Sequence, residues 1–351
     1  MPVELNWPEF GQAALVADGY GELGTSGSIT PLATASIAKV ITALCVLEKH
    51  PIPAGSQGES IQFSSQDVLL YREQISQNGS RLPVYDGQRM SQYEALQAVM
   101  VPSANNIADS LAIWAFGSLD SYAKYANSYL LRHGLVNTRV GTDASGLDPS
   151  TRSTAEDLAR LGLIATKNRT LMEIAGQKFV SFSYGGDYDN YNRALGTHGI
   201  TGLKTGNNDE NPGALLFTAV SPSGPSIKTL SGAVMGASDL STAIAAAQRL
   251  VESASDDFEQ IVYVEKGDIV GELRTAWGEK SMLVAERDMI LDRWRARPIT
   301  TKVVQTAGDG TSNSSIARVE AFSDTSRATS GIQSKTNVNG PSAWWRLTHI
   351  R

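Results

Sequence analysis

The stretch Thr34-Ala-Ser-Ile-Ala-Lys-Val-Ile-Thr-Ala-Leu-Cys-Val-Leu-Glu-Lys-His50 decides how the rest of the chain is interpreted. Its apolar residues recur three and four positions apart, which predicts a helix with one buried face. Ser36 stands at the start of this helix and Lys39 one turn later, so the two side chains share a face. A hydroxyl beside an amine, under the free N–H groups of a helix N-terminus, is a candidate acyl-transfer nucleophile.

The same pair also has an ordinary structural interpretation. A serine at a helix start is a common N-cap, and a lysine in a first turn is a common surface residue. Ser121 and Lys124 repeat the spacing at the start of a helix expected over about 122–132, where Lys124 is expected on the surface. The first pair therefore gains weight only through the motifs that follow it.

Length and composition exclude several classes of protein. With 351 residues, 41% of them hydrophobic and 19% charged, the chain can form a soluble globular protein with a sizeable core. A net charge of −6 and the lack of basic runs with interleaved aromatic residues argue against nucleic acid as a partner. No apolar run predicts a membrane span, and the opening Met1–Asn6 lacks the basic and apolar regions of a signal peptide.

Cysteine and histidine offer no metal or redox chemistry. Cys45 is the only cysteine, so no intrachain disulfide can form, and its apolar surroundings predict a buried, inert thiol. The four histidines, His50, His133, His198 and His349, lack metal-ligand spacing. We therefore predict no metal site, no cofactor and no Ser-His-Asp triad.

The expected order of elements places helices between strands. Residues 13–28 predict a β-hairpin, and residues 51–88 predict loops and short helices. Capping-box patterns at Ser91–Glu94 and Ser153–Glu156 predict the starts of two further helices. Strands are expected at 179–183, 199–206, 214–220 and 230–235, followed by a helix at about 240–253. This order predicts an α/β (α+β) domain, a sheet with an inserted helical subdomain.

A second domain is expected after the acidic stretch at Asp256–Glu259. Beyond it, short β-runs at 261–264, 269–270, 282–285 and 303–304 alternate with glycine and charged turns, which predicts a small β-rich domain. We therefore divide the chain into residues 1–255 and 256–351. The aromatic and basic end, Ala343–Arg351, is interpreted as a final strand, with an anchor beside a lipid surface as the functional alternative.

Three motifs carry the chemistry and stand in the order Ser36-x-x-Lys39, Ser103-x-Asn105 and Lys204-Thr205-Gly206. In the first, the serine attacks a carbonyl, and the lysine takes its proton if the amine is kept neutral by desolvation or by neighbouring cations. Ser76-Gln-Asn78 and Lys335-Thr-Asn337 are chance matches to the other two motifs. The order of the three motifs, their separations along the chain and the elements on which they are expected together make the combination specific.

The second and third motifs supply groups around the nucleophile. Ser103 can relay the proton to a leaving amine, and Asn105 can hold a substrate amide. Lys204 provides a positive field and Thr205 a hydroxyl, while Gly206 allows a strand edge to approach the ligand closely.

With these motifs the chain resembles the D-alanyl-D-alanine carboxypeptidases, low-molecular-mass penicillin-binding proteins with S-x-x-K, S-D-N and K-T-G motifs. Asp143-Ala-Ser-Gly-Leu147 is similar to a further stretch in these enzymes, and the resemblance covers about residues 8–255. Val264–Leu273 resembles, less specifically, the small β-domain that follows in several members. The resemblance implies a β-lactamase/transpeptidase-like fold, a five-stranded antiparallel sheet with a helical subdomain, followed by an all-β domain.

The resemblance also implies residue roles. Ser36 would be acylated by the penultimate D-alanine of a peptidoglycan stem peptide, expelling the terminal D-alanine, with Lys39 as base. Ser103 and Asn105 would shuttle the proton and bind the peptide amide. Water would then release the enzyme, and β-lactams would acylate the same serine.

Substrate binding is implied for the third motif. Lys204 and Thr205 would bind the terminal carboxylate, and the N–H groups of Ser36 and of Asn207, which follows Gly206, would form the oxyanion hole. Because stem peptides lie outside the cytoplasmic membrane, the resemblance implies an exported, extracytoplasmic protein, although this chain carries no recognisable signal or anchor.

The sequence departs from the family pattern in places. Ala104 and Asn106 flank Asn105 where these enzymes often carry Ser-Gly-Asn-Asp, and Asn207–Asn211 is more acidic than expected, so substrate preference can differ. Ile200-Thr-Gly202 also varies the approach to the third motif. No C-terminal amphipathic anchoring helix is expected.

Two other functions compete. A class A serine β-lactamase needs a Glu-x-x-Leu-Asn stretch between the second and third motifs, and Glu156–Arg160 lacks the asparagine. A non-catalytic peptidoglycan-binding module has no physical need for intact Ser36, Lys39, Asn105 and Lys204. Within the enzyme class, transpeptidase and endopeptidase action stay open, because water or an amine can attack the same acyl-enzyme.

Overall fold

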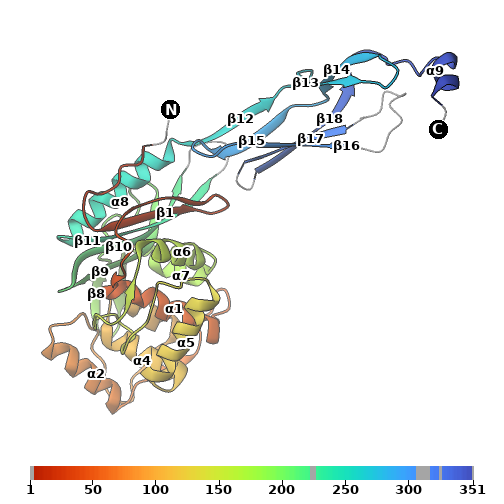
Figure 1. Ribbon diagram of the computed structural model, residues 1–351. Helices are drawn as coiled ribbons and strands as arrows, with labels where there is room; N and C mark the ends of the chain where they lie inside the picture. Colours follow the sequence, from red (N-terminus) through yellow and green to blue (C-terminus); the bar gives the residue numbers. More distant parts are fainter. Residues whose placement is uncertain (1–3, 222–226, 306–316, 324–325, 350–351) are drawn as a thin grey trace. The chain divides into compact units, whose positions relative to one another are not determined.

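The computed structural model describes residues 4–221, 227–305, 317–323 and 326–349. The chain divides into two compact units, which we describe separately. The larger unit comprises Glu4–Pro222 and Ser226–Ser255, and the smaller contains the described residues from Asp256 onward (Figure 1).

An antiparallel five-stranded sheet forms the centre of the larger unit, with strand order β2-β1-β11-β10-β9. The predicted hairpin at 13–28 is confirmed as β1 and β2, and the third motif lies on β9, at an edge of the sheet. The strands are β1 (Gln12–Ala17), β2 (Gly21–Gly27), β9 (Ile200–Asn208), β10 (Asn211–Ser221) and β11 (Lys228–Ala237). The predicted α/β (α+β) fold of this unit is confirmed.

Two helices pack against this sheet, α6 (Ala155–Thr166) and α8 (Leu240–Ser255) (Figure 1). Strands β10 and β11 are buried along most of their length, because helices cover both faces of the sheet. Gly162 permits the close approach of α6, since a Cβ atom there would lie 1.9 Å from Ser231 Oγ. The long helix expected at 240–253 is confirmed.

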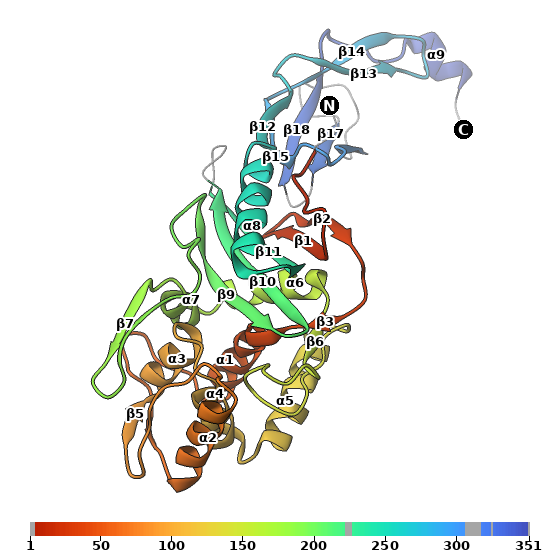
Figure 2. The same ribbon diagram turned by 90° about the vertical axis from the view of Figure 1, so that its left-hand side faces the viewer.

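The helical subdomain follows the first motif and lies beside the β9 edge (Figure 2). Its apolar faces form one large buried cluster, to which α1, α3, α4 and α5 contribute. The helices are α1 (Ala38–Lys49), α2 (Ser65–Ser76), α3 (Gln92–Met100), α4 (Asn105–Phe116), α5 (Leu119–Arg132) and α7 (Arg169–Ala175). Short two-stranded pairs connect them: β3 (Leu32–Ala33) with β6 (Arg152–Ser153), β4 (Ser60–Gln62) with β5 (Arg89–Ser91), and β7 (Phe179–Phe182) with β8 (Gly186–Asp189).

Helix caps confirm one sequence prediction and correct another. Ser91 caps α3 in a full capping box, accepting from the N–H of Glu94 while the Glu94 side chain accepts from the N–H of Ser91. The box predicted at Ser153–Glu156 is wrong, because Thr154 caps α6 and accepts from the N–H of Asp157. Ser153 belongs to β6, and its hydroxyl meets that of Thr138 at 2.7 Å.

The smaller unit consists almost entirely of antiparallel strands. Two form the pair β12-β15, and five form a sheet in the order β13-β14-β18-β17-β16. They are β12 (Phe258–Val264), β13 (Ile269–Arg274), β14 (Lys280–Ala285), β15 (Met289–Trp294), β16 (Thr300–Gln305), β17 (Ala317–Ser323) and β18 (Ser326–Ser334). All four predicted β-runs lie in strands, whereas β15, β17 and β18 were missed because charged and hydroxyl residues interrupt their apolar pattern.

The C-terminal prediction is wrong. Instead of a final strand, the structure has the short helix α9 (Ala343–Thr348), capped by Ser342; Ile350 and Arg351 lie outside the described residues. A strand was expected because aromatic residues favour strands, but here the N-cap starts a helix. Within the ranges described above, no helix is both long enough and apolar enough to cross a bilayer.

Candidate active site

Ser36 lies in a 3-10 turn, Ala35–Ile37, immediately before α1. Ala35 has a φ of +46°, which is uncommon for a residue with a side chain and marks a strained backbone beside the nucleophile. Lys39 is in the first turn of α1, and its Nζ donates to Ser36 Oγ at 2.8 Å. The predicted contact between hydroxyl and amine is therefore present.

The Lys39 amine is fully buried and makes three hydrogen bonds. Besides Ser36, it donates to Asn105 Oδ1 at 2.7 Å and to the Ser145 carbonyl at 2.8 Å. Burial lowers the pKa of Lys39 to about 7, against the opposing field of Asp143 and Asp109. A substantial fraction of the amine is thus neutral near pH 7, as a general base requires.

The segment Asp143–Leu147, which carries part of the family resemblance, holds this lysine through the Ser145 carbonyl. Asp109 accepts the Ala144 N–H at 2.8 Å, which fixes the chain next to the Ser145 carbonyl. Gly146 packs on the nucleophile turn, since a Cβ atom there would lie 2.1 Å from the carbonyl oxygen of Ala35. The segment therefore couples the geometry of Lys39 to that of Ser36.

Asp109 is a buried carboxyl group that the motif analysis missed. It lies one turn after Asn105 on α4, and burial raises its pKa to about 7, helped by the negative charge of Asp143 and opposed by the Ala144 N–H and the charge of Lys39. An acid in the apolar run Ile107–Leu111 was the available signal, because such a residue is seldom buried without a partner.

The second motif lies at the start of α4. Asn105 joins the first motif through Lys39 and donates through Nδ2 to Gln74 Oε1 at 2.9 Å. Ser103 is 3% exposed and has a φ of +61°, and its Oγ has no hydrogen-bond partner among the described residues. A buried hydroxyl without a partner is available to a substrate or a proton.

The third motif reaches the site from the edge strand β9. Lys204 and Thr205 are buried, and burial, with the nearby charge of Lys39, lowers the pKa of Lys204 well below its usual value. The only hydrogen bond recorded for Lys204 Nζ in the described part of the chain goes to the Thr205 carbonyl at 3.3 Å. A Cβ atom at Gly206 would lie 2.8 Å from the carbonyl oxygen of Thr34. Because glycine has none, β9 packs directly on the turn that carries Ser36.

An open cleft of about 570 Å³ collects these elements. Its lining includes Ser36 and Asn105 from the first two motifs, Asn207–Glu210, which directly follow the third motif, and Gln77–Ser80. Sequence analysis did not place Gln77–Ser80 at the site, because neutral polar loop residues carry no periodic signal. Asn78, part of a chance motif match, thus lies in the cleft without belonging to the motif.

The competing candidates lie elsewhere. Lys124 is exposed, as predicted, and so is Ser121, but α5 begins at Leu119, so the lysine lies in the second turn of the helix and not in the first. Glu156, the residue examined for a β-lactamase base, is on α6, where it pairs with Arg160 and does not line the cleft. Cys45 is buried, and burial raises the pKa of its thiol, in agreement with an inert cysteine. In the described ranges no three acidic, histidine or cysteine side chains gather to hold a metal ion.

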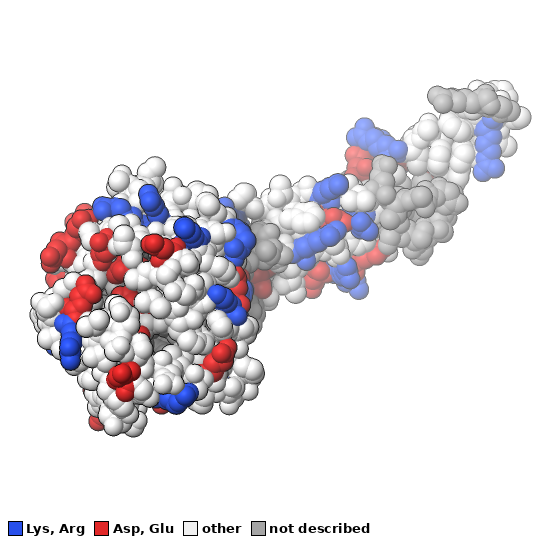
Figure 3. Space-filling model, turned by 90° about the horizontal axis from the view of Figure 1, so that it is seen from below, with Lys and Arg blue, Asp and Glu red and all other residues white. Residues whose placement is uncertain are grey.

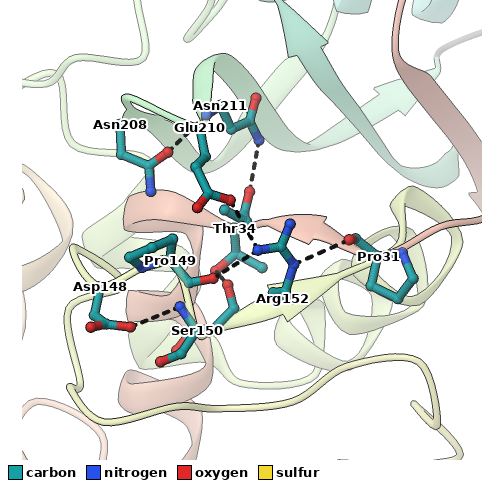
Figure 4. Close-up of polar contacts among 11 residues, drawn as sticks. Pro31, Thr34, Asp148, Pro149, Ser150, Arg152, Asn208, Glu210 and Asn211 are labelled. Carbon is teal, nitrogen blue, oxygen red and sulfur yellow. Dashed lines mark hydrogen bonds and ion pairs between the residues drawn. The ribbon is translucent and has the colours of Figure 1, made fainter.

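Surface charge on the larger unit is mixed. Figure 3 shows acidic and basic side chains interspersed over the visible face, without a continuous basic band. The acidic turn that follows the third motif is drawn in Figure 4, where Arg152 reaches Glu210 from the β6 side of the cleft.

Comparison with known proteins identifies relatives. A family model described as D-alanyl-D-alanine carboxypeptidase, peptidase S11, matches residues 23–239. The D-alanyl-D-alanine carboxypeptidase DacD of Salmonella typhimurium is 26% identical over 271 residues, which are 75% of this chain and 66% of that protein. The chain thus spans slightly less than two thirds of this relative's length.

Two solved structures share the fold. Penicillin binding protein 5 from Haemophilus influenzae aligns over 97% of this chain and 99% of its own, with a TM-score of 0.68 and 20% identity. The Streptomyces K15 DD-transpeptidase aligns over 72% of this chain and 98% of its own, with a TM-score of 0.62 and 21% identity.

Proposed function

Because the chain belongs to the D-alanyl-D-alanine carboxypeptidase family, we propose that it removes the terminal D-alanine from peptidoglycan stem peptides through an acyl-enzyme on Ser36. One observation carries this proposal: the Lys39 amine, with its pKa lowered to about 7, lies 2.8 Å from the Ser36 hydroxyl. A serine hydroxyl needs such a base to become a nucleophile.

In the acylation step, Ser36 Oγ bonds to the carbonyl carbon of the penultimate D-alanine while its proton passes to Lys39 Nζ. The N–H groups of Ser36 and Asn207 stabilise the negative charge that develops on the carbonyl oxygen. The C–N bond then breaks, and the departing amine receives the proton from Lys39 through the Ser103 hydroxyl. Asn105 binds the peptide amide and keeps the lysine in place through the 2.7 Å hydrogen bond.

In the deacylation step, water attacks the ester carbonyl and gives its proton to Lys39. The ester bond breaks, and Ser36 recovers its proton.

Lys204 and Thr205 bind the terminal carboxylate of the incoming peptide, next to Gly206 on the β9 edge. β-Lactams carry a carboxylate and a strained amide in a similar arrangement, so they acylate Ser36 and inhibit the enzyme.

Intact-protein mass spectrometry tests the proposal. The protein is incubated with penicillin and, separately, with diacetyl-Lys-D-Ala-D-Ala, while free D-alanine is measured. We expect a stable penicilloyl adduct and D-alanine release, both of which Ser36→Ala abolishes. Ser121→Ala is the matched control, because Ser121 has the same spacing to a lysine but lies on the surface; it should retain both activities.

Other outcomes favour the competing functions. Rapid penicillin hydrolysis without a lasting adduct would indicate a serine β-lactamase. If neither adduct nor D-alanine forms, a non-catalytic peptidoglycan-binding module is the better account. Labelling that persists in Ser36→Ala would place the nucleophile elsewhere.

We assign catalysis to residues 1–255 and treat 256–351 as an accessory β-rich domain. The division is supported by the positions of the three motifs, all of which lie in the larger unit. Peptidoglycan lies outside the cytoplasmic membrane, so this function requires an extracytoplasmic location.

We also propose that α9 associates with a lipid surface. Trp344 and Leu347 are 75% and 68% exposed, a basic side chain, Arg346, neighbours them, and Trp345 packs on Trp277 with ring centroids 5.9 Å apart. Exposed tryptophan beside a basic residue is typical of membrane interfaces. In vesicle co-sedimentation, the double change Trp344→Ser and Leu347→Ser should release the protein from lipid, whereas an exposed valine changed elsewhere, Val303→Ser, should not.

A further inference from the structure

The turn between β9 and β10 contributes the only charged side chains to the cleft lining in the described structure. Asp209 and Glu210 are both acidic, and the remaining lining residues are neutral. Because Ser36 lines the same cleft, a bound substrate lies within the field of this turn. The two carboxylates differ in their surroundings.

Glu210 is already paired. Its carboxylate contacts Arg152 Nη1 at 2.9 Å, and the same guanidinium donates to the carbonyls of Pro31 and Pro149, each at 3.3 Å (Figure 4). Arg152 is thus held in place and offsets the charge of Glu210. The charge of Asp209 has no such counterpart, since no ion pair of Asp209 is recorded in the described part of the chain.

The backbone that carries Asp209 is fixed by asparagine side chains. Asn211 donates to the Ala33 carbonyl at 2.9 Å and accepts from the Gly236 N–H at 3.0 Å, which ties the turn to the segment preceding Ser36. Asn208 accepts the Asn211 N–H at 2.8 Å (Figure 4). Asp209 therefore keeps a set position relative to the nucleophile.

A second observation at the same turn points to a ligand. The Asn208 side chain uses its oxygen within the turn, while its Nδ2 atom is buried and has no hydrogen-bond partner among the described residues. An amide nitrogen in this state is suited to donate to a carbonyl of a bound peptide. A peptide that offers both a carbonyl oxygen and a cation would accept the hydrogen bond from Asn208 Nδ2 and pair with the carboxylate of Asp209.

We propose that Asp209 is a specificity-determining residue, which favours stem peptides whose residue before D-Ala-D-Ala carries a side-chain ammonium. The inference rests on the proposed function and names the substrate class of that site. The carboxylate is exposed, so the attraction is that of a solvent-screened pair. We expect a preference of roughly fivefold, which corresponds to ~1 kcal/mol.

Two substrates that differ only in one charge test this. Nα-acetyl-Lys-D-Ala-D-Ala keeps its ε-ammonium, whereas the Nα,Nε-diacetyl peptide is neutral there. For the unaltered protein at low salt, kcat/KM should be roughly fivefold higher for the charged peptide, and 0.5 M NaCl should reduce this ratio because it screens exposed charges. Asp209→Asn should bring the ratio to about 1, because it removes the charge that distinguishes the two peptides.

Asp187→Asn is the matched control, because Asp187 is an exposed carboxylate on β8 that does not line the cleft. It changes the net charge equally and should preserve the ratio. A ratio of 1 in the unaltered protein, or an undiminished ratio in Asp209→Asn, would overturn the inference while D-alanine release upholds the proposed function. Failure to release D-alanine from either peptide would overturn both.

Discussion

At the scale of single residues, the site depends on the protonation of one buried amine. Burial disfavours the charged form of Lys39, while the carboxyl groups of Asp109 and Asp143 favour it, and burial is the larger effect. The result is a pKa of about 7, which leaves the amine able both to accept a proton from Ser36 and to return one. Sequence spacing alone could not supply this value, because it depends on the burial and the neighbouring charges that the folded chain places around the amine.

The first prediction concerns pH. Lys39 acts as a base only when neutral, so the rate of Ser36 acylation by penicillin should rise through pH about 7 and level off above it. Stopped-flow or quenched mass spectrometry measures this profile. Lys39→Ala should slow acylation by roughly two or more orders of magnitude, the scale of general-base loss. A variant that acylates at the parental rate would remove Lys39 from this role.

The second prediction concerns Asp109 as a positioning residue. Asp109→Asn keeps an oxygen for the Ala144 N–H but removes a carboxyl group whose ionised form raises the pKa of Lys39. The pKa of the amine should therefore fall, and the rising limb of the acylation profile should move to lower pH. The charge of Asp143 also raises the pKa of Lys39, and Lys204 interacts electrostatically with the same amine. Both residues are therefore left unchanged in the experiment. An unmoved limb would contradict the electrostatic role.

At the scale of elements, the close packing of two loops decides the geometry of the site. Gly146 and Gly134 both have positive φ values, +75° and +73°, yet only Gly146 faces backbone where a Cβ atom would stand. A left-handed residue with a side chain costs roughly 1–2 kcal/mol in either place. A side chain at position 146 would in addition clash with the carbonyl oxygen of Ala35, which belongs to the turn that carries Ser36.

The third prediction uses this matched pair of glycines. Gly134→Ala should lower the free energy of unfolding by about 1 kcal/mol and leave penicillin labelling unchanged. Gly146→Ala should destabilise the protein more and slow labelling, because the loop must move away from Ser36. Denaturant unfolding and the labelling rate of the folded fraction measure both effects. Equal labelling rates would show that the loop does not hold the nucleophile turn.

At the scale of the whole molecule, the two units have separate buried clusters. The cluster of the smaller unit includes Met289, Leu291 and Ile332, and that of the larger unit joins the sheet to the helical subdomain. Separate cores permit separate unfolding. The three motifs all belong to the larger unit, so a ligand bound there stabilises that unit.

The fourth prediction follows from this division. Calorimetry of the full chain should resolve two unfolding transitions, and penicillin acylation should raise the Tm of only one, since a ligand stabilises the unit that binds it. Ser36→Ala is the control and should show no shift with penicillin. A single transition would mean that the units unfold together, and two transitions that both shift would mean that ligand binding in one unit also stabilises the other.

The sequence by itself determined the hairpin, the principal helices and the order of the three motifs, because periodicity, turn residues and caps act over short distances. It misplaced the cap of α6 by one residue, since Ser153 and Thr154 are both good caps and only their tertiary neighbours distinguish them. It also missed the helix at the C-terminus and three strands of the smaller unit.

Only the tertiary structure decided what surrounds the nucleophile. Ser145 reaches Lys39 and Gln74 reaches Asn105 from segments far apart in the chain, and Asp109 accepts the distant Ala144 N–H. These contacts follow from how α2, α4 and the loop before β6 pack together. The same packing leaves Asp209 in the cleft without an ion-pair partner among the described residues, while Arg152 neutralises Glu210. Burial and long-range charge set the pKa values, and neither is a property of local sequence.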